Sequence, residues 1–268
     1  SSGYYGTIRK SVKEILLFHK INGWINLSEK KNKEVFSLTL GGLGLTGTIV
    51  NVTFKLEKFN FTEFQTLKQK TLSIYELIKY FKNMKHKKNE FIYSWNITNS
   101  NHSFGKGFIF KNIPIKTDKK IKDIELKKKI KLNLPFSLWN KFSTKIFNNT
   151  YFKYLSLKND NFNESFVNAM FPFHKKEQYF TLFGRCGFIE SQLLVPKNVI
   201  DNFFEEFIYL FHKYQPCITL FSIKVLSGEQ KLIRFEGNGI CVTFDFVNNK
   251  KSLFFLKKLD KLCIKYKI

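Results

Sequence analysis

The chain has 268 residues, of which 43% are hydrophobic and 17% aromatic, with 32 Phe among them. This apolar content excludes an intrinsically disordered protein and is enough for one large domain or two smaller ones, each with its own core. The formal net charge is +24, from 45 Lys and Arg against 21 Asp and Glu. Such a charge alone would favour nucleic acid or an anionic membrane as a partner. Lys is, however, spread along the chain among many Asn, Ile and Phe, a bias typical of an AT-rich genome, so nucleic-acid binding is not favoured.

The cysteines and the apolar runs limit the cellular setting. Four cysteines, Cys186, Cys217, Cys241 and Cys263, form no CxxC motif and no ligand spacing with His. They predict reduced thiols in a cytoplasmic protein and no metal site. No apolar run approaches the roughly 18–20 residues of a membrane-spanning helix, and no signal peptide is visible. The densest basic stretch, residues 116–131, alternates Lys with Ile and Leu and indicates a solvated helix or an edge strand.

The first sixty residues predict a hairpin, a helix and a strand. Two apolar runs within 11–27 surround Asn22-Gly23, which is a hairpin turn signal. Ser28 can cap a helix over 29–40, and Gly41 suits the left-handed residue that ends many helices. Residues 46–58 then alternate as a half-buried strand does.

The rest of the chain predicts further strands and helices. We expect a helix over Ser73–Met84, strands over 90–98 and 106–112, and mostly irregular structure over 132–165. The last third predicts strands over 187–195, 218–226, 230–236 and 239–247, and helices over 198–214 and 250–266. Strands and helices in this order predict an α+β fold on an antiparallel sheet.

A cluster of glycines stands out at residues 41–49, which read Gly-Gly-Leu-Gly-Leu-Thr-Gly-Thr-Ile. Glycine costs roughly 0.5–1 kcal/mol inside regular structure, so four of them in seven positions need a reason. The spacing matches neither the GxGxxG fingerprint nor a P-loop. Two interpretations stay open: a tight joint between helix and strand, or backbone that a ligand approaches closely.

Several motifs in order resemble one family. The opening Ser-x-Gly-x-x-Gly, the hairpin, the helix and the glycine cluster resemble the second half of the FAD-binding domain of FAD-linked oxidases of the vanillyl-alcohol-oxidase type. Later matches narrow the resemblance to the decaprenylphosphoryl-β-D-ribose 2′-oxidases and their bacterial relatives. These matches are Tyr93-Ser94-Trp95, Gly105-Lys106-Gly107, Phe171-Pro172, Gly184, Gly187-Phe188-Ile189-Glu190-Ser191-Gln192, Gly239 and Asp245-Phe246.

The resemblance implies a division of the chain and a set of cofactor residues. Residues 1–60 would be a partial FAD-binding domain, and residues 61–268 a substrate-binding or cap domain. Gly3 and Gly6 would lie near the flavin pyrophosphate. Ile49 would lie against the cofactor, and the backbone would pass close to FAD at Gly41, Gly42, Gly44 and Gly47. Backbone N–H groups of such a loop are natural partners for phosphate oxygens.

The resemblance also implies substrate residues. Gln192 would face the sugar, Glu190 takes the place of a second glutamine of the family, and Lys224 matches a family lysine if a one-residue gap is allowed. Without that gap the matching position is Ile223.

Two further positions follow from a gapless run over 235–245. Thr243 takes the position of the family's active-site Cys or small residue, and Cys241 lies two residues earlier on the same strand face. Each candidate has a structural alternative: Gln192 satisfying backbone groups, Glu190 as a surface charge, or Cys241 as a small core residue. No catalytic residue is assigned, and His174 and His212 have no sequence partners that indicate catalysis.

The implied function is FAD-dependent oxidation of a secondary alcohol of a sugar by hydride transfer to flavin. The substrate would be a polyprenyl-phosphate-linked pentose of cell-envelope polysaccharide biosynthesis. A reductase partner would complete an epimerisation, and the basic surface would contact anionic membrane from the cytoplasmic side. Two alternatives stay open: a sugar-1,4-lactone oxidase, and a non-catalytic remnant or partner-binding module. The family also has an N-terminal FAD lobe and a C-terminal return segment that this sequence lacks, so we expect a fragment.

Overall fold

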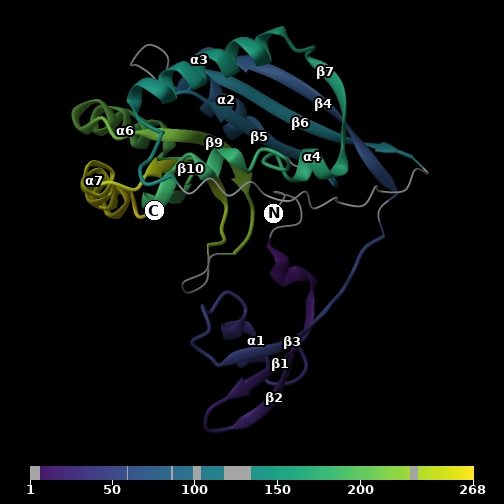
Figure 1. Ribbon diagram of the computed structural model, residues 1–268. Helices are drawn as coiled ribbons and strands as arrows, with labels where there is room; N and C mark the ends of the chain where they lie inside the picture. The colour runs from purple at the N-terminus through teal and green to yellow at the C-terminus, as the bar shows by residue number, and fades with distance from the viewer. Residues whose placement is uncertain (1–6, 59, 86, 99–103, 118–133, 230–234) are drawn as a thin grey trace. The chain divides into compact units, whose positions relative to one another are not determined.

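The computed structural model describes residues 7–58, 60–85, 87–98, 104–117, 134–229 and 235–268 (Figure 1). The chain divides into two compact units, which we call unit 1 (Ser1–Phe59 with Leu226–Asn238) and unit 2 (Asn60–Val225 with Gly239–Ile268). Helices and antiparallel strand pairs make up both units, so the predicted α+β class with a large antiparallel sheet is confirmed.

Unit 1 is a three-stranded sheet with one helix packed on it. The strands β1 (Val12–His19), β2 (Gly23–Ser28) and β3 (Thr48–Phe54) lie in the order β2-β1-β3, after a short 3-10 helix η1 (Ile8–Ser11). β1 and β2 form the predicted hairpin, and Gly23 after the turn has the left-handed φ of 66°. The helix α1 (Lys33–Thr39) covers one face of this sheet. The small core between them consists of Ile15, Leu17, Leu27, Phe36 and Leu40.

The start of α1 corrects one prediction. Ser28 does not cap the helix, because its hydroxyl accepts hydrogen bonds from the N–H groups of Lys30 and Lys31, at 3.2 and 3.0 Å. This local turn competes with helix formation, as serine side chains often do. The helix therefore begins only after Asn32, which has a left-handed φ of 54°. The other end is confirmed: Gly41 follows the last helical turn with a φ of 81°.

Unit 2 is built on a seven-stranded sheet in the order β7-β4-β6-β5-β9-β10-β8. β4 is paired antiparallel with β6 and β7, β5 with β6 and β9, and β10 with β8. The strands are β4 (Phe61–Thr71), β5 (Phe91–Asn96), β6 (Gly107–Lys116), β7 (Asn161–Ser165), β8 (Phe188–Val195), β9 (Ile218–Leu226) and β10 (Gly239–Val247).

Helices cover both faces of this sheet. One face carries α2 (Ile74–Asn83), α6 (Ile200–Tyr214) and α7 (Lys250–Tyr266), which enclose the main core. The other carries α3 (Lys141–Leu157), α4 (Phe166–Met170) and α5 (Gln178–Thr181), followed by a 3-10 turn, η3 (Gly184–Cys186). Figure 1 shows α3 running across the strands of its face.

Phenylalanine fills the main core. All the largest fully buried side chains are Phe, and half of them come from α6, β9 and β10. Phe244 on β10 is the centre of this packing: its ring stacks on Phe207 of α6 at 4.7 Å and on Phe221 of β9 at 4.8 Å. Stacked and edge-to-face rings add roughly 0.5–1.5 kcal/mol per pair to the free energy of burial.

Side-chain hydrogen bonds join β5 to β9 in the middle of the sheet. The Ser94 hydroxyl accepts from the Ile223 N–H at 3.0 Å, and Asn96 Nδ2 donates to Ser94 Oγ at 2.8 Å and to the Phe221 carbonyl at 3.3 Å. These buried side chains form hydrogen bonds with backbone groups of β9 that regular strand pairing would otherwise satisfy. The two halves of the sheet are thus held in register at this joint.

Residues 132–165 correct a second prediction. They contain the 17-residue helix α3, where we expected mostly irregular structure. Asn140 and Ser143 form a capping box at its start. Its apolar residues point both to the sheet and to solvent, so the sequence lacks the one-sided periodicity that predicts a helix.

Other predictions are confirmed, or concern residues that the structure does not describe. The helices at α2, α6 and α7 and the strands at β5, β8, β9 and β10 lie where the sequence placed them, within a few residues. β4 was not predicted, and β6 continues beyond the predicted end at 112 to Lys116. The predicted basic helix or edge strand over 116–131, and the strand over 230–236, lie largely outside the described residues.

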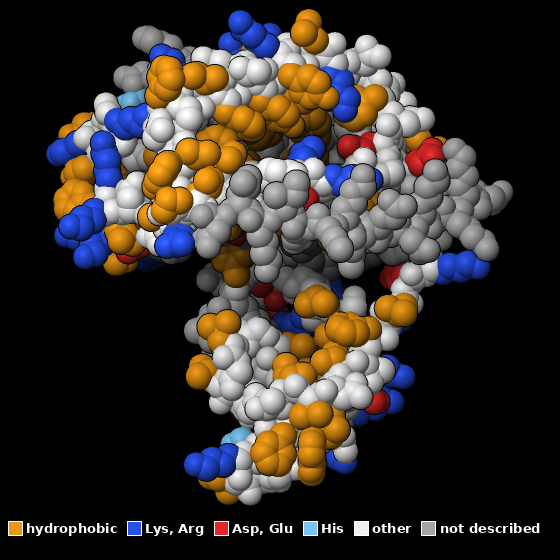
Figure 2. Space-filling model, viewed as in Figure 1, with side chains coloured by type: hydrophobic (Ala, Val, Ile, Leu, Met, Phe, Trp, Pro, Cys, Tyr) orange, Lys and Arg blue, Asp and Glu red, His pale blue; other side chains and the backbone are white. Residues whose placement is uncertain are grey.

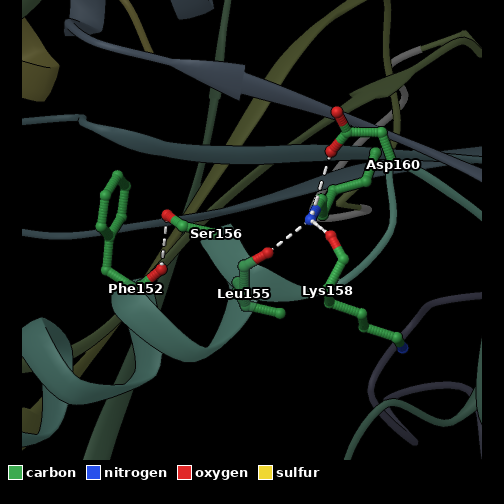
Figure 3. Close-up of polar contacts among 6 residues, drawn as sticks. Phe152, Leu155, Ser156, Lys158 and Asp160 are labelled. Carbon is green, nitrogen blue, oxygen red and sulfur yellow. Dashed lines mark hydrogen bonds and ion pairs between the residues drawn. The ribbon is translucent and has the colours of Figure 1, made fainter.

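A buried lysine holds the C-terminal end of α3. Lys68 Nζ donates to the carbonyls of Leu155 and Lys158 and pairs with Asp160 Oδ1 at 3.2 Å (Figure 3). The side chain of Lys68 is 0% exposed, whereas that of Asp160 is 84% exposed. The carbonyls at a helix end have no partner within the helix, and the helix dipole favours a cation there. Lys68 therefore ties α3 to β4.

Replacing this lysine should weaken the fold. For Lys68→Met we expect a loss of about 2–4 kcal/mol in the free energy of unfolding, because the two carbonyls lose their buried donor. The measurement is urea unfolding followed by circular dichroism. The control is Lys116→Met at the exposed end of β6, for which we expect a change within about 0.5 kcal/mol. Equal losses in the two variants would contradict the capping role.

Candidate functional site

The candidate site lies on the face of the unit 2 sheet opposite the phenylalanine core, over β8 and β10. The register pairs Gln192 with Thr243 and Glu190 with Asp245. Because side chains alternate along a strand, these four residues and Cys241 share one face of the sheet. We call these five residues, together with Lys224 of β9, the polar face.

Short contacts connect the polar face at its exposed edge. Gln192 Nε2 donates to Glu190 Oε1 at 2.6 Å, and Cys241 Sγ lies 4.0 Å from Gln192 Oε1. β8 is an edge strand, and both Glu190 and Gln192 are exposed. Cys241 and Thr243, on the neighbouring strand, are 0% and 7% exposed. The polar face therefore runs from a buried centre to an accessible carboxylate and amide.

Lys224 and Ile223 lie on opposite faces of β9. Ile223 is 0% exposed and packs in the main core, so it cannot meet a ligand on the polar face. Lys224 is partly exposed and lies close enough to Cys241 to lower the pKa of its thiol. Burial has the larger, opposite effect, so the Cys241 pKa is raised. The thiol is neutral near pH 7 and is therefore a poor nucleophile.

A second polar group continues this face and was missed by the sequence analysis. Tyr179 of α5 donates its hydroxyl hydrogen bond to Asp245 Oδ2 at 2.9 Å and lies 2.6 Å from Thr219 Oγ1. Thr219 Oγ1 also donates to the Asp245 carbonyl at 3.3 Å. The sequence signal for this group was an Asp placed between Phe244 and Phe246 in a strongly apolar strand. Such a position predicts a buried carboxyl with a dedicated partner.

Asp245 is a buried carboxyl whose pKa is strongly raised. It is 1% exposed, and among the described residues its Oδ1 has no hydrogen-bond partner. Burial raises its pKa to about 7, with Glu190 adding to the rise and the Tyr179 hydrogen bond opposing it. Burial and the nearby Asp245 also raise the pKa of Tyr179, which stays a neutral donor. Asp245 can thus hold or release a proton near neutral pH.

The glycine cluster in unit 1 forms a loop between α1 and β3. Gly41, Gly44 and Gly47 have left-handed φ values of 81°, 79° and 136°. A Cβ at Gly42 would lie 2.1 Å from the Leu38 carbonyl oxygen, and one at Gly47 would lie 2.7 Å from that of Phe18. The close approaches at Gly42 and Gly47 are therefore made by the chain itself, as the helix-to-strand interpretation requires.

Gly44 differs from its neighbours, because a Cβ there would meet nothing within 4 Å. In the part of the chain that the structure describes, the backbone N–H groups of Leu43, Gly44 and Thr46 have no acceptor. Leu43 also has a left-handed φ, of 51°. Successive N–H groups in such a conformation form a concave donor site for an anion. The loop therefore presents three backbone donors of the kind that bind phosphate oxygens.

The apolar side chains around this loop are accessible. Ile49, which the resemblance places against the cofactor, is 46% exposed, and Leu43 is 83% exposed. Figure 2 shows hydrophobic side chains over the strands of unit 1. Gly3 and Gly6, the other two candidate cofactor residues, lie outside the described residues.

The histidines and cysteines show no metal or disulfide chemistry among the described residues. No group of three or more His, Cys, Asp or Glu side chains there could hold a metal ion. All four cysteines are free thiols. Burial lowers the pKa of His212, whose Nε2 is buried without a partner in this part of the chain. His212 is neutral near pH 7 and lies apart from the polar face, on α6.

No protein-family model matches the chain, and no curated protein matches it. Within the described ranges, no helix has both the length and the apolar character needed to cross a membrane.

The proton on Asp245 predicts a pH dependence of stability. The carboxyl has a pKa of about 7 in the folded state, against an ordinary value of 3.8. The folded state therefore holds this proton more tightly, and its contribution to stability is complete below about pH 4 and is lost as the pH rises to about 7. In urea unfolding, the free energy of unfolding of the unaltered protein should fall by about 2–4 kcal/mol between pH 4 and pH 8. Asp245→Asn should remove this fall.

A matched control separates this effect from other titrating groups. Asp260→Asn changes an exposed carboxyl on α7, and it should leave the pH profile of the unaltered protein in place. If Asp245→Asn and the unaltered protein show parallel profiles, Asp245 is ionised in the fold and the proposed proton is absent.

Proposed function

We propose that this chain belongs to an FAD-dependent oxidoreductase that oxidises a secondary alcohol of a sugar, with a polyprenyl-phosphate-linked pentose as substrate. One observation carries the proposal. The residues that the resemblance assigns to the substrate come from three different strands, and they lie on one face of one sheet. The order of the motifs in the sequence also supports the proposal, because these residues follow from the sequence resemblance alone.

The polar face offers the groups that a sugar phosphate needs. The exposed Gln192 presents an amide to sugar hydroxyls, and the buried Thr243 lies opposite it on the neighbouring strand. Glu190 accepts from Gln192 Nε2 and so fixes which way the amide points. Lys224 supplies a positive charge for an anionic phosphate, and Asp245 can hold a proton at the buried end of the face.

The loop of unit 1 would hold the cofactor. The N–H groups of Leu43, Gly44 and Thr46 would donate to phosphate oxygens of FAD, and Ile49 would give it an apolar contact. Bound flavin would accept the hydride that leaves the sugar carbon, while the protein positions the sugar.

Two other functions share parts of this support. A sugar-1,4-lactone oxidase would use the same cofactor and the same polar face, and a reductase partner that completes an epimerisation would distinguish the pentose enzyme from it. A non-catalytic, partner-binding module would keep the fold without the cofactor. Flavin binding separates this last alternative from the two oxidases.

Flavin binding by the loop can be tested with a matched pair of variants. We expect the purified chain to retain FAD through gel filtration, with a flavin absorbance spectrum. In Gly44→Asn a side chain would stand beside the free N–H groups, and the Kd for FAD should rise about tenfold. Gly23→Asn places the same residue at a similar left-handed φ, 66° against 79°, with open space at both sites, so it should bind FAD as the unaltered chain does.

The negative results have distinct meanings. A folded chain that retains no FAD contradicts flavin chemistry by this chain alone and favours the non-catalytic alternative. Retained FAD with equal Kd values for the two variants supports the cofactor but contradicts the role of the Leu43–Thr46 donors.

We also propose that unit 2 contacts anionic membrane through the outer side of α3. Thr144, Asn148 and Leu155 of this helix are buried. The opposite side presents Phe142, Ile146 and Leu157, which are 73%, 51% and 87% exposed. α3 contains three lysines and no acidic residue, and Figure 2 shows hydrophobic and basic side chains side by side on this view of the molecule. Apolar residues beside lysines are typical of helices that lie on anionic lipid.

Vesicle sedimentation tests this contact. The chain should bind vesicles that contain phosphatidylglycerol, and Phe142→Ser with Ile146→Ser should weaken binding about tenfold or more, because apolar area no longer enters the lipid. Tyr209→Ser with Leu253→Ser is the control, since these side chains are 64% and 46% exposed on α6 and α7. Equal losses in both double variants, or equal binding to neutral vesicles, would contradict the assignment.

A further inference from the structure

A groove on the opposite face of the unit 2 sheet is separate from the polar face. It runs along α2 where this helix crosses β4, β5 and β6, and its volume is about 530 Å³. Ile74, Leu77, Ile78 and Phe81 of α2 are buried, so the helix lines the groove with its remaining sides. A volume of this size matches that of a small-molecule site.

Positive charge is concentrated in this groove. Lys79 and Lys85 line one side, and Lys111 of β6 lines the floor. Lys111 Nζ lies 3.3 Å from Oε2 of the buried Glu90, so the two charges compensate each other. Among the described residues, neither Lys79 nor Lys85 has an acidic partner within ion-pair distance. Two ammonium groups are therefore available to an anion.

The acidic residue within the groove is already engaged. Glu76 Oε2 accepts from the Leu72 N–H at 2.8 Å, at the start of α2. The Ser73 hydroxyl accepts from the Glu76 N–H at 3.3 Å in the same turn. Glu76 thus serves the N-terminus of the helix, where a carboxylate is favoured.

A buried hydroxyl in the groove lacks a partner. Thr71 is 2% exposed, and its Oγ1 makes no hydrogen bond to any residue that the structure describes. It lines the groove with Gln69, two residues earlier on the same face of β4. An unpartnered buried hydroxyl costs about 1–3 kcal/mol, and a bound group that accepts its proton would remove that cost.

The remaining lining residues suit the organic part of an anionic ligand. Tyr80, Met84 and Ile92 contribute apolar surface, and Asn83 adds an amide. Burial, with a smaller effect of Glu90, raises the pKa of Tyr80, so its phenol remains a neutral hydrogen-bond donor. We infer that this groove binds a phosphate monoester of a sugar or nucleoside, with the phosphate at Lys79 and Lys85 and a hydroxyl of the ligand at Thr71.

Ribose 5-phosphate and AMP are the probes for this site, measured by isothermal titration against the whole chain. Both should bind with a Kd of about 1 mM or tighter, and ribose and adenosine should bind at least about tenfold more weakly. Lys79→Gln with Lys85→Gln should weaken AMP binding about tenfold or more. Lys257→Gln with Lys261→Gln, which removes the same charge from exposed positions on α7, should change the Kd less than about twofold.

Thr71→Val gives a second, independent readout. The valine has the same shape, and no hydrogen bond inside the described chain is lost, so the unfolding midpoint should stay the same or rise. Binding of ribose 5-phosphate should nevertheless weaken several-fold. Equal losses in the two double-lysine variants would show general attraction to a basic surface, and the absence of saturable binding by both phosphate probes would also overturn the inference. FAD is in neither assay, so these results do not depend on the oxidoreductase proposal.

Discussion

The structure of unit 2 depends on the alternation of side chains along β10. Every residue of this strand is buried, and the two faces of the strand carry opposite chemistry. Phe244 and Phe246 enter the core beneath α6 and α7, whereas Thr243 and Asp245 face the other way. A shift of one residue in the pairing with β8 would place Asp245 among the phenylalanine rings. The cost of burying a carboxyl there fixes the register, and the register assembles the polar face.

The same register gives the polar face its gradient of exposure. β8 is an edge strand, so Glu190 and Gln192 remain open to solvent, while the adjoining Asp245 is enclosed beneath Tyr179. The two carboxyl groups that the register pairs, Glu190 and Asp245, therefore have different environments. Burial raises the pKa of Asp245 and so makes a proton easier to hold there. Acid–base chemistry of the kind proposed needs such a difference between neighbouring carboxyl groups.

Most regular elements could be predicted from the sequence because their patterns are local. The hairpin follows from Asn22-Gly23, the end of α1 from Gly41, and α6 from its stripe of Phe. The failures also have local causes. Ser28 has the residue type of a helix cap, but its hydroxyl closes a local turn with Lys30 and Lys31 instead. The helix α3 has apolar residues on both of its sides, so its sequence lacks the usual helix signal.

The sequence by itself determined the order of the motifs, the alternation along the strands and the residue types available to a sugar or a phosphate. Only the tertiary structure decided which of them meet. It brought Tyr179 and Thr219 to Asp245, it turned Lys224 and not Ile223 toward Cys241, and it placed Lys68 at the end of a helix about 90 residues later. These contacts join residues far apart in the chain, and they are set by strand pairing and burial, which no local pattern specifies.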